Sequence, residues 1–252
     1  MKGFPNQVAE LAKLSLAMRC IVQLADQGEQ AKDYGVLGEA LVRAGVAGPG
    51  HRKQPIEQYI RTQRRKKPDD QSFRTTARGL RELFRILGFI DDSGENIEIT
   101  TLGRNAAAFA GRPINEEQTT FWRRAIRNMS HDGGDGEESH PYQVLLALIA
   151  AKPKISKSKC ALALEAKNGS PDELARITAL ADLPDEEIRN RLRISRTGDR
   201  VSKPNWANAV KVLPKLAEQL GDVVKSSCSP AATQSVGAKA RSSIGKGRRP
   251  DV

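Results

Sequence analysis

The arginines of residues 71–87, QSFRTTARGLRELFRIL, recur at intervals of four, three and four positions. On a helix this spacing places them within about 60° of one another, on a different side from the apolar residues. Guanidinium groups presented together can bind phosphates, or bond the O6 and N7 atoms of guanine in pairs. We therefore predict a DNA-binding helix with the basic row Arg74, Arg78, Arg81 and Arg85. The alternative is a solvated basic face that is paired with acids such as Glu82.

Two further sets of residues are candidates for contacts with DNA phosphates, where any cationic side chain can serve. The first is the basic run before the arginine row, which comprises Arg61, Arg64, Arg65, Lys66 and Lys67. The second lies at an expected helix start, where free amides and positive side chains converge, and comprises Ser156, Lys157 and Lys159. The alternative for the first set is a solvated loop, and for the second it is ordinary helix capping.

Catalytic chemistry has little support in this sequence. Glu165 and Lys167 have the E-x-K spacing of magnesium-dependent nucleases, with Asp69 or Asp70 as the possible partner acid. Such a site needs its carboxylates on adjacent strands, yet these residues lie in helical or loop sequence. The histidines and acids of residues 131–140 match no zinc or EF-hand spacing, and no phosphate-binding loop or H-E-x-x-H motif occurs. We expect no catalytic residue, metal site or cofactor in this chain.

The overall charge indicates a polyanionic partner. The 252 residues include 41 lysines and arginines against 30 acids, which gives a formal net charge of +11. Nucleic acid is the expected partner, and an acidic membrane surface is the alternative. Neither a signal-peptide core nor a membrane span is recognisable, and the three cysteines form no C-x-x-C pair. We therefore expect a cytoplasmic, nucleoid-associated protein with free thiols.

The elements around the arginine row follow the order of a winged helix. Amphipathic helices are expected over residues 6–27 and 36–44, and a third begins at Pro55. Ser72 is a candidate cap for the arginine helix, and Gly88 can end it. Strands are expected at residues 89–90 and 97–99, with an Asp-Asp-Ser-Gly turn between them, and then a helix over 101–110. A further amphipathic helix is expected over residues 115–129.

The second half of the chain is expected to form another helical unit. The acid-rich and glycine-rich residues 131–140 are typical of an interdomain linker. Helices are then expected from Tyr142 onward, with a reduced wing at SRTGDRVSK. Residues 225–252 have almost no large apolar side chains, which predicts a disordered basic tail. The fold class is therefore mainly α, with tandem winged-helix domains over 1–130 and 141–224, the linker over 131–140 and the tail over 225–252.

Two segments, SFRTTARGLRELFRILGFIDDSGENIEITTLGRNA and HPYQVLLALIAAKPKISKSKCALALEA, resemble the N-terminal recognition region of type IIS restriction endonucleases and related nicking endonucleases. The resemblance covers roughly residues 35–165 and rests on the hydrophobic pattern, Gly88 and the I-x-I-T-x-x-G of residues 97–103. It implies tandem winged-helix subdomains that recognise an asymmetric DNA site. In the family a separate C-terminal PD…(D/E)xK nuclease domain that needs magnesium follows, whereas here a helix and the tail follow. The resemblance therefore implies that this chain recognises DNA and that a nuclease domain or subunit is its partner.

These observations support two functions that involve DNA binding, and a third interpretation involves none. The first is sequence-specific binding of double-stranded DNA as the recognition module of a restriction-endonuclease-type protein. The alternative is a winged-helix transcriptional regulator, which would usually dimerise on a palindrome. The third is a protein-interaction scaffold that does not bind DNA. The sequence leaves the oligomeric state, the recognised bases and the attachment of a nuclease open.

Overall fold

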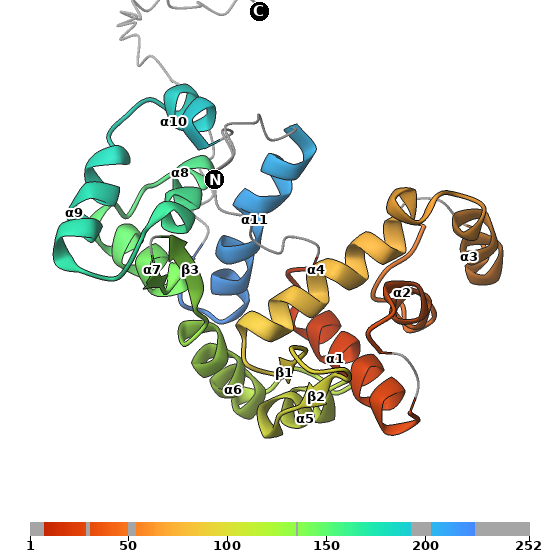
Figure 1. Cartoon of the computed structure of the whole chain (residues 1–252). Coiled ribbons are helices and arrows are strands. Elements are labelled where there is room, and N and C mark those ends of the chain that lie inside the picture. Colours follow the sequence, from red (N-terminus) through yellow and green to blue (C-terminus); the bar gives the residue numbers. More distant parts are fainter. Residues whose placement is uncertain (1–7, 29–30, 50–53, 135, 193–202, 225–252) are drawn as a thin grey trace, which may run out of the picture.

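The computed structural model describes residues 8–28, 31–49, 54–134, 136–192 and 203–224. Eleven α-helices and two antiparallel two-stranded hairpins make up these described residues, so the mainly helical class is confirmed. Figure 1 shows the first helices and the last ones gathered into two groups, with α11 beside the second group. The expected reduced wing and the expected tail lie outside the described residues, apart from Lys203 at the end of the former.

The first group contains the arginine helix. Its elements are α1 (Leu11–Asp26), α2 (Tyr34–Arg43), α3 (Ile56–Arg64), a 3-10 turn η1 (Pro68–Asp70), α4 (Ser72–Ile86), β1 (Ile90–Asp91), β2 (Glu98–Ile99), α5 (Thr101–Ala108) and α6 (Glu116–Arg127). Ile90 pairs with Ile99, and Asp91 pairs with Glu98. The expected order of helix, hairpin and helix is therefore present. The assignment of this unit to the winged-helix class stays a prediction, because each strand has only two residues.

The two ends of α4 are set by different means. Gly88, with a φ of +68°, takes the left-handed conformation that ends the helix, as expected. Ser72 does not cap the helix, because it already lies in the first turn and Gln71 occupies the cap position. The Ser72 amide instead donates to Oε1 of Gln63 at 3.1 Å. A side chain of α3 therefore accepts a hydrogen bond from an amide in the first turn of α4. The sequence around Ser72 could not indicate this, because the acceptor lies nine positions upstream.

The second group begins with a structured hairpin. Its elements are β3 (His131–Gly134), β4 (Glu137–Ser139), α7 (Pro141–Ala151), α8 (Lys157–Cys160), a 3-10 segment η2 (Ala161–Glu165), α9 (Pro171–Leu180), α10 (Asp185–Leu192) and α11 (Lys203–Gln219). The segment expected to be a linker thus pairs with itself, with His131 opposite Ser139. Gly136, at a φ of +79°, lies in the turn between the strands. Glycine and aspartate are favoured in tight turns and also occur in linkers, so composition alone did not separate the two.

One hydrophobic core runs through both groups. Buried residues of α1, α2, α4, α6, α7, η2 and α11 belong to a single contiguous cluster. Phe89 is a fully buried member of it, and its ring centroid lies 6.0 Å from that of Phe84 and 5.5 Å from that of Trp122. Cys20 and Cys160 are buried free thiols, and burial raises the pKa of Cys160 to about 11. The two predicted domains therefore share their packing.

The end of α11 connects the two groups through polar contacts. Gln219 accepts a hydrogen bond from the Leu11 amide at 3.1 Å, next to the start of α1. Asp222 pairs with Arg123 of α6 at 2.9 Å and accepts a hydrogen bond from the Tyr142 hydroxyl at 2.9 Å. Burial and this carboxylate raise the pKa of Tyr142. Within the described ranges, no helix has both the length and the apolar character needed to cross a lipid bilayer.

Candidate nucleic-acid interface

Helix α4 packs closely against α2 through its apolar side. Its buried residues are Phe73, Ala77, Leu80, Leu83 and Phe84. Gly38 of α2 makes the contact possible, because a Cβ at this position would lie 2.4 Å from Cδ2 of Phe73. Only glycine allows such an approach. This packing decides which side of α4 can meet a ligand.

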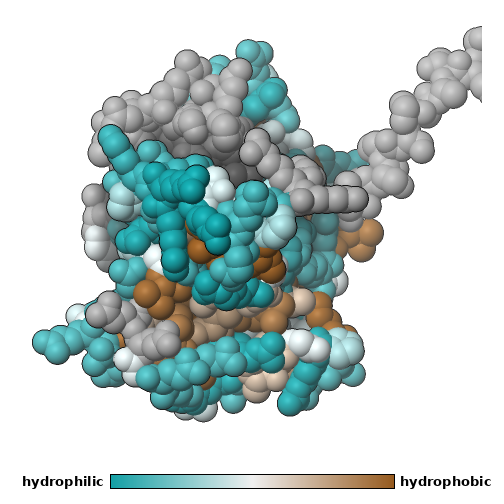
Figure 2. Space-filling view, turned by 90° about the vertical axis from the view of Figure 1, so that its right-hand side faces the viewer, coloured by the Kyte–Doolittle hydropathy of each residue, from teal (hydrophilic) through white to brown (hydrophobic). Residues whose placement is uncertain are grey.

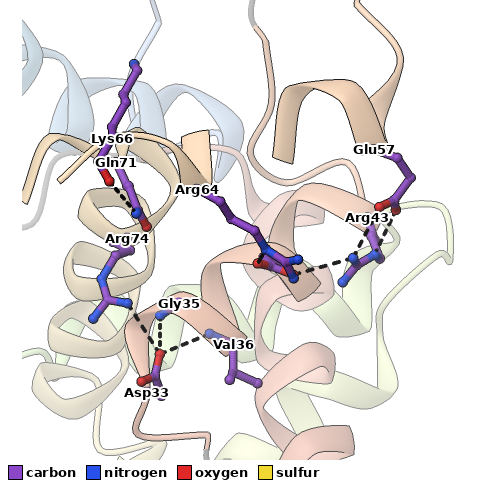
Figure 3. A network of polar contacts seen from close by, with 10 residues as sticks. Asp33, Gly35, Val36, Arg43, Glu57, Arg64, Lys66, Gln71 and Arg74 are labelled. Atoms are coloured by element: carbon purple, nitrogen blue, oxygen red, sulfur yellow. Dashed lines mark hydrogen bonds and ion pairs between the residues drawn. The ribbon is translucent and has the colours of Figure 1, made fainter. Parts of the chain in front are cut away.

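The arginine row is divided by this packing. Arg74 points toward the start of α2, where its guanidinium lies 3.5 Å from the Asp33 carboxylate (Figure 3). The same carboxylate caps α2 by accepting hydrogen bonds from the amides of Gly35 and Val36. The Arg74 side chain keeps 27% of its surface exposed. Arg74 therefore belongs partly to the α2–α4 contact.

Arg81 lies deeper in the same contact. Its Nη1 donates to the backbone oxygen of Lys32 at 2.8 Å, and its Nη2 donates to the Tyr34 hydroxyl at 2.5 Å. Its Nε lies 3.0 Å from Oδ2 of Asp92, and its guanidinium stands over the Tyr34 ring at 4.2 Å. Only 16% of the side chain is exposed. Every nitrogen of this guanidinium already has a protein partner.

Arg78 and Arg85 are the exposed members of the row. Arg78 is 59% exposed, stacks loosely on Tyr34 at 5.4 Å and lies 3.6 Å from the Asp69 carboxylate. Arg85 is 51% exposed and pairs with Glu82, one turn earlier, at 2.6 Å; this carboxylate raises the pKa of Arg85. We call the exposed side chains of this surface the α4 outer row, which comprises Thr75, Arg78, Glu82 and Arg85.

The basic run of residues 61–67 adjoins the start of α4. The Gln71 side chain donates to the backbone oxygen of Lys66 at 3.1 Å, and the Tyr59 hydroxyl lies 2.6 Å from Oγ of Ser72. Arg64 forms two hydrogen bonds to Glu39 of α2, at 2.5 and 2.6 Å, which raise its pKa (Figure 3). The other four cations are exposed and form no ion pair with described residues; we call Arg61, Arg65, Lys66 and Lys67 the basic run cations.

The side of the molecule where α2 and α3 lie has a mixed surface. Hydrophilic side chains cover most of it, and hydrophobic residues are exposed in a band across its middle (Figure 2). Val36 of α2 and Ile56 of α3 are among the exposed large hydrophobic residues, at 37% and 42%.

The second candidate phosphate site is occupied by a carboxylate. The Ser156 hydroxyl donates to Oδ2 of Asp185 at 2.7 Å, while its oxygen accepts from the Lys159 amide, as a helix cap does. The Lys159 ammonium lies 3.6 Å from the Asp185 carboxylate and donates to the Ala181 oxygen at 2.8 Å. Lys157 is exposed. These contacts favour the capping alternative for Ser156.

The nuclease-like residues do not lie on neighbouring strands. Glu165 ends the 3-10 segment η2, whereas Asp69 lies in the turn η1 of the other group. Among the described residues, no group of three or more histidine, cysteine, aspartate or glutamate side chains is placed to hold a metal ion. The E-x-K residues and Asp69 therefore do not have the adjacent-strand arrangement that this nuclease motif needs.

Three residues that the sequence did not single out define this surface: Tyr34, Asp33 and Asp92. Asp33 precedes α2, Tyr34 begins α2, and Asp92 follows β1. Only the fold brings these residues to the arginines of α4. The Asp-Asp-Ser-Gly segment was recognised as a turn, and its second aspartate is the partner of Arg81.

Comparisons of the chain with family models, with curated proteins and with solved structures found no match.

Proposed function

We propose that this chain binds double-stranded DNA in a sequence-specific manner, with the α4 outer row against base edges and the basic run cations against phosphates. One observation supports this most strongly. An exposed helix side with two arginines is joined at its start to four exposed cations that form no ion pair with the described residues. An exposed cation without an ion pair keeps its full attraction for an external anion, whereas an ion pair such as that of Arg85 with Glu82 carries less net charge.

The chemistry of the α4 outer row suits the major groove, which is about 12 Å wide and admits a helix. Arg78 can bond O6 and N7 of guanine, and Glu82 can accept from N4 of cytosine. Arg85 is held by Glu82 at 2.6 Å, so this pair would meet the groove in a fixed geometry. The outer row therefore favours a site with G·C pairs under the middle of α4.

The phosphate contacts would come from the segment between α3 and α4. If the four basic run cations neutralise about four phosphates, the logarithm of the binding constant should fall by about 3.6 for each tenfold increase in salt concentration. The proposed winged-helix role of the β1–β2 hairpin fits this arrangement, because a wing flanks the reading helix in such proteins.

The resemblance to type IIS restriction and nicking endonucleases refines this proposal. It assigns the chain to recognition of an asymmetric site, with a nuclease domain or subunit supplying the magnesium-dependent cleavage. Glu165 and Asp69 lie in different elements of the two groups, so the proposal assigns cleavage to the partner rather than to these residues. A transcriptional regulator would share the surface, but it would select a palindrome and bind it as a dimer.

The test is selection of bound sites from a random duplex library, followed by affinity measurements between about 50 and 200 mM salt. We expect one asymmetric sequence, a steep loss of affinity with salt, and no strand cleavage when magnesium is added. The double variant Arg61→Ala/Arg65→Ala should weaken binding to all duplexes and flatten the salt dependence. Arg191→Ala, which removes an exposed charge from α10, is the control and should change neither. Absence of duplex binding at low salt would overturn the proposal.

A further inference from the structure

Arg81 differs from the other arginines of α4 in how its guanidinium is held. Its three nitrogens contact Asp92, the Lys32 backbone oxygen and the Tyr34 hydroxyl at 3.0, 2.8 and 2.5 Å. The Cζ atom of the group also lies over the Tyr34 ring, 4.2 Å from its centroid. We call Arg81 with these three partners the Arg81 clamp.

The Arg81 clamp joins three segments that are distant in the sequence. Arg81 lies within α4, and Asp92 directly follows β1. Lys32 lies just before α2, and Tyr34 is the first residue of α2. A second contact reinforces the same junction, because the Lys32 ammonium donates to the Gly94 oxygen in the hairpin turn. The turn of the β1–β2 hairpin is therefore tied both to α4 and to the segment before α2.

Burial decides whether Arg81 could leave the clamp to contact DNA. Its side chain is 16% exposed and that of Asp92 is 17%, against 59% for Arg78 on the neighbouring turn. Release would leave the Asp92 carboxylate, the Lys32 oxygen and the Tyr34 hydroxyl without their donor in a partly desolvated place, which is costly. Arg78 can contact a base without losing comparable partners.

We infer that Arg81 is a positioning residue, which sets the β1–β2 hairpin and the start of α2 relative to the α4 outer row. This inference rests on the proposed function, because the hairpin and the outer row must meet the same duplex for their relative placement to matter. Arg81 then contributes to recognition without touching DNA, and Asp92 contributes to it in spite of its negative charge.

The sign of the effect at Asp92 separates the two roles of Arg81. If Arg81 bound a phosphate, Asp92→Asn would remove a competing carboxylate, and DNA affinity would stay the same or increase. If Arg81 positions the hairpin, Asp92→Asn weakens the clamp, and affinity for the selected site falls. Glu95→Gln is the matched control, because Glu95 is an exposed acid of the same hairpin and its loss changes the net charge equally.

We expect Asp92→Asn to bind the selected duplex at least fivefold more weakly than Glu95→Gln. Both variants should bind a scrambled duplex equally, with the wild-type salt dependence. Arg81→Lys keeps the charge but cannot make all the clamp bonds, so it should behave like Asp92→Asn. The inference is overturned if Asp92→Asn binds as tightly as Glu95→Gln, or if Arg81→Lys retains wild-type affinity while Arg81→Ala lowers the salt slope by about 0.9.

A measurement without DNA distinguishes failure of the clamp from failure of the proposed function. In Asp92→Asn, hydrogen exchange of the hairpin amides around Ile90 and Ile99 should be at least tenfold faster than in Glu95→Gln. Circular dichroism establishes that both variants are folded. Unchanged exchange would refute the clamp even if the duplex is bound. Faster exchange in a protein that binds no duplex would refute the proposed function and leave the clamp as a structural contact only.

Discussion

At the scale of single residues, the exposure of a guanidinium matters more than its place on a helical wheel. Arg78 and Arg81 are three positions apart, yet the first is 59% exposed and the second 16%. The wheel placed both in one row because it contains no information about α2. A single-residue prediction must therefore begin from the partners that each arginine already has.

Arg78→Ala should weaken binding to the selected duplex by about 1–3 kcal/mol, because Arg78 is the exposed arginine that has no close acid on its own helix. The loss should be larger for the selected sequence than for a scrambled one, as expected when a base contact is removed. Titration of both duplexes with the variant and the wild type measures the difference. An equal loss on both would make Arg78 a phosphate contact.

Asp69→Asn should strengthen binding two- to fivefold at low salt. The Asp69 carboxylate is 92% exposed and lies 3.6 Å from Arg78, so it repels phosphates and competes for the guanidinium. The gain should shrink as salt is raised, because exposed charges are screened. Glu187→Gln, which removes an exposed acid from α10, should leave affinity unchanged. Weaker binding by Asp69→Asn would show that the turn η1 needs this carboxylate.

At the scale of elements, periodicity predicted the positions of the helices, but it did not predict how they are capped, connected and packed. Residues 71–87 and 101–110 are helical within one or two residues of their expected ends, and both expected strands are present. The expected linker is a hairpin, and Ser72 is not a cap. Local pattern determines helix and strand, whereas capping by Gln63 and the contact with Gly38 depend on tertiary packing.

Gly38→Ala should destabilise the protein by about 1–3 kcal/mol, the usual cost of overpacking. An added Cβ would lie 2.4 Å from Cδ2 and 2.9 Å from the backbone oxygen of Phe73, and the oxygen cannot move without displacing α4. Denaturant unfolding measures the change. Gly48→Ala is the control, since a Cβ there would meet nothing within 4 Å. Equal stability of the two variants would show that α2 can withdraw from α4.

At the scale of the whole molecule, the two groups of helices are not independent. The hydrophobic core is continuous between them, and α11 returns to the start of α1. The composition of residues 131–140 suggested a boundary, but long-range burial is not visible in composition. Asp222 is the polar centre of this connection, with a side chain that is only 10% exposed.

Asp222→Asn should lower the free energy of unfolding by about 2–4 kcal/mol, because it leaves Arg123 without its carboxylate in a partly buried place. The Tyr142 hydroxyl would also lose its charged acceptor at 2.9 Å. Unfolding should remain a single transition with the variant, since both groups share the core. Two separated transitions in the wild type would contradict the shared core. Asp172→Asn, on the surface of α9, is the control.

The close contact at Gly38 has a consequence for thermodynamics. Because α2 and α4 are locked together before any ligand arrives, a duplex would meet a finished surface rather than a helix that must first form. The heat-capacity change of binding should then match the buried area alone, without the additional negative contribution that accompanies folding on binding. The association rate should then be limited by diffusion and electrostatic attraction rather than by a conformational change within the protein. It should therefore fall as the salt concentration is raised.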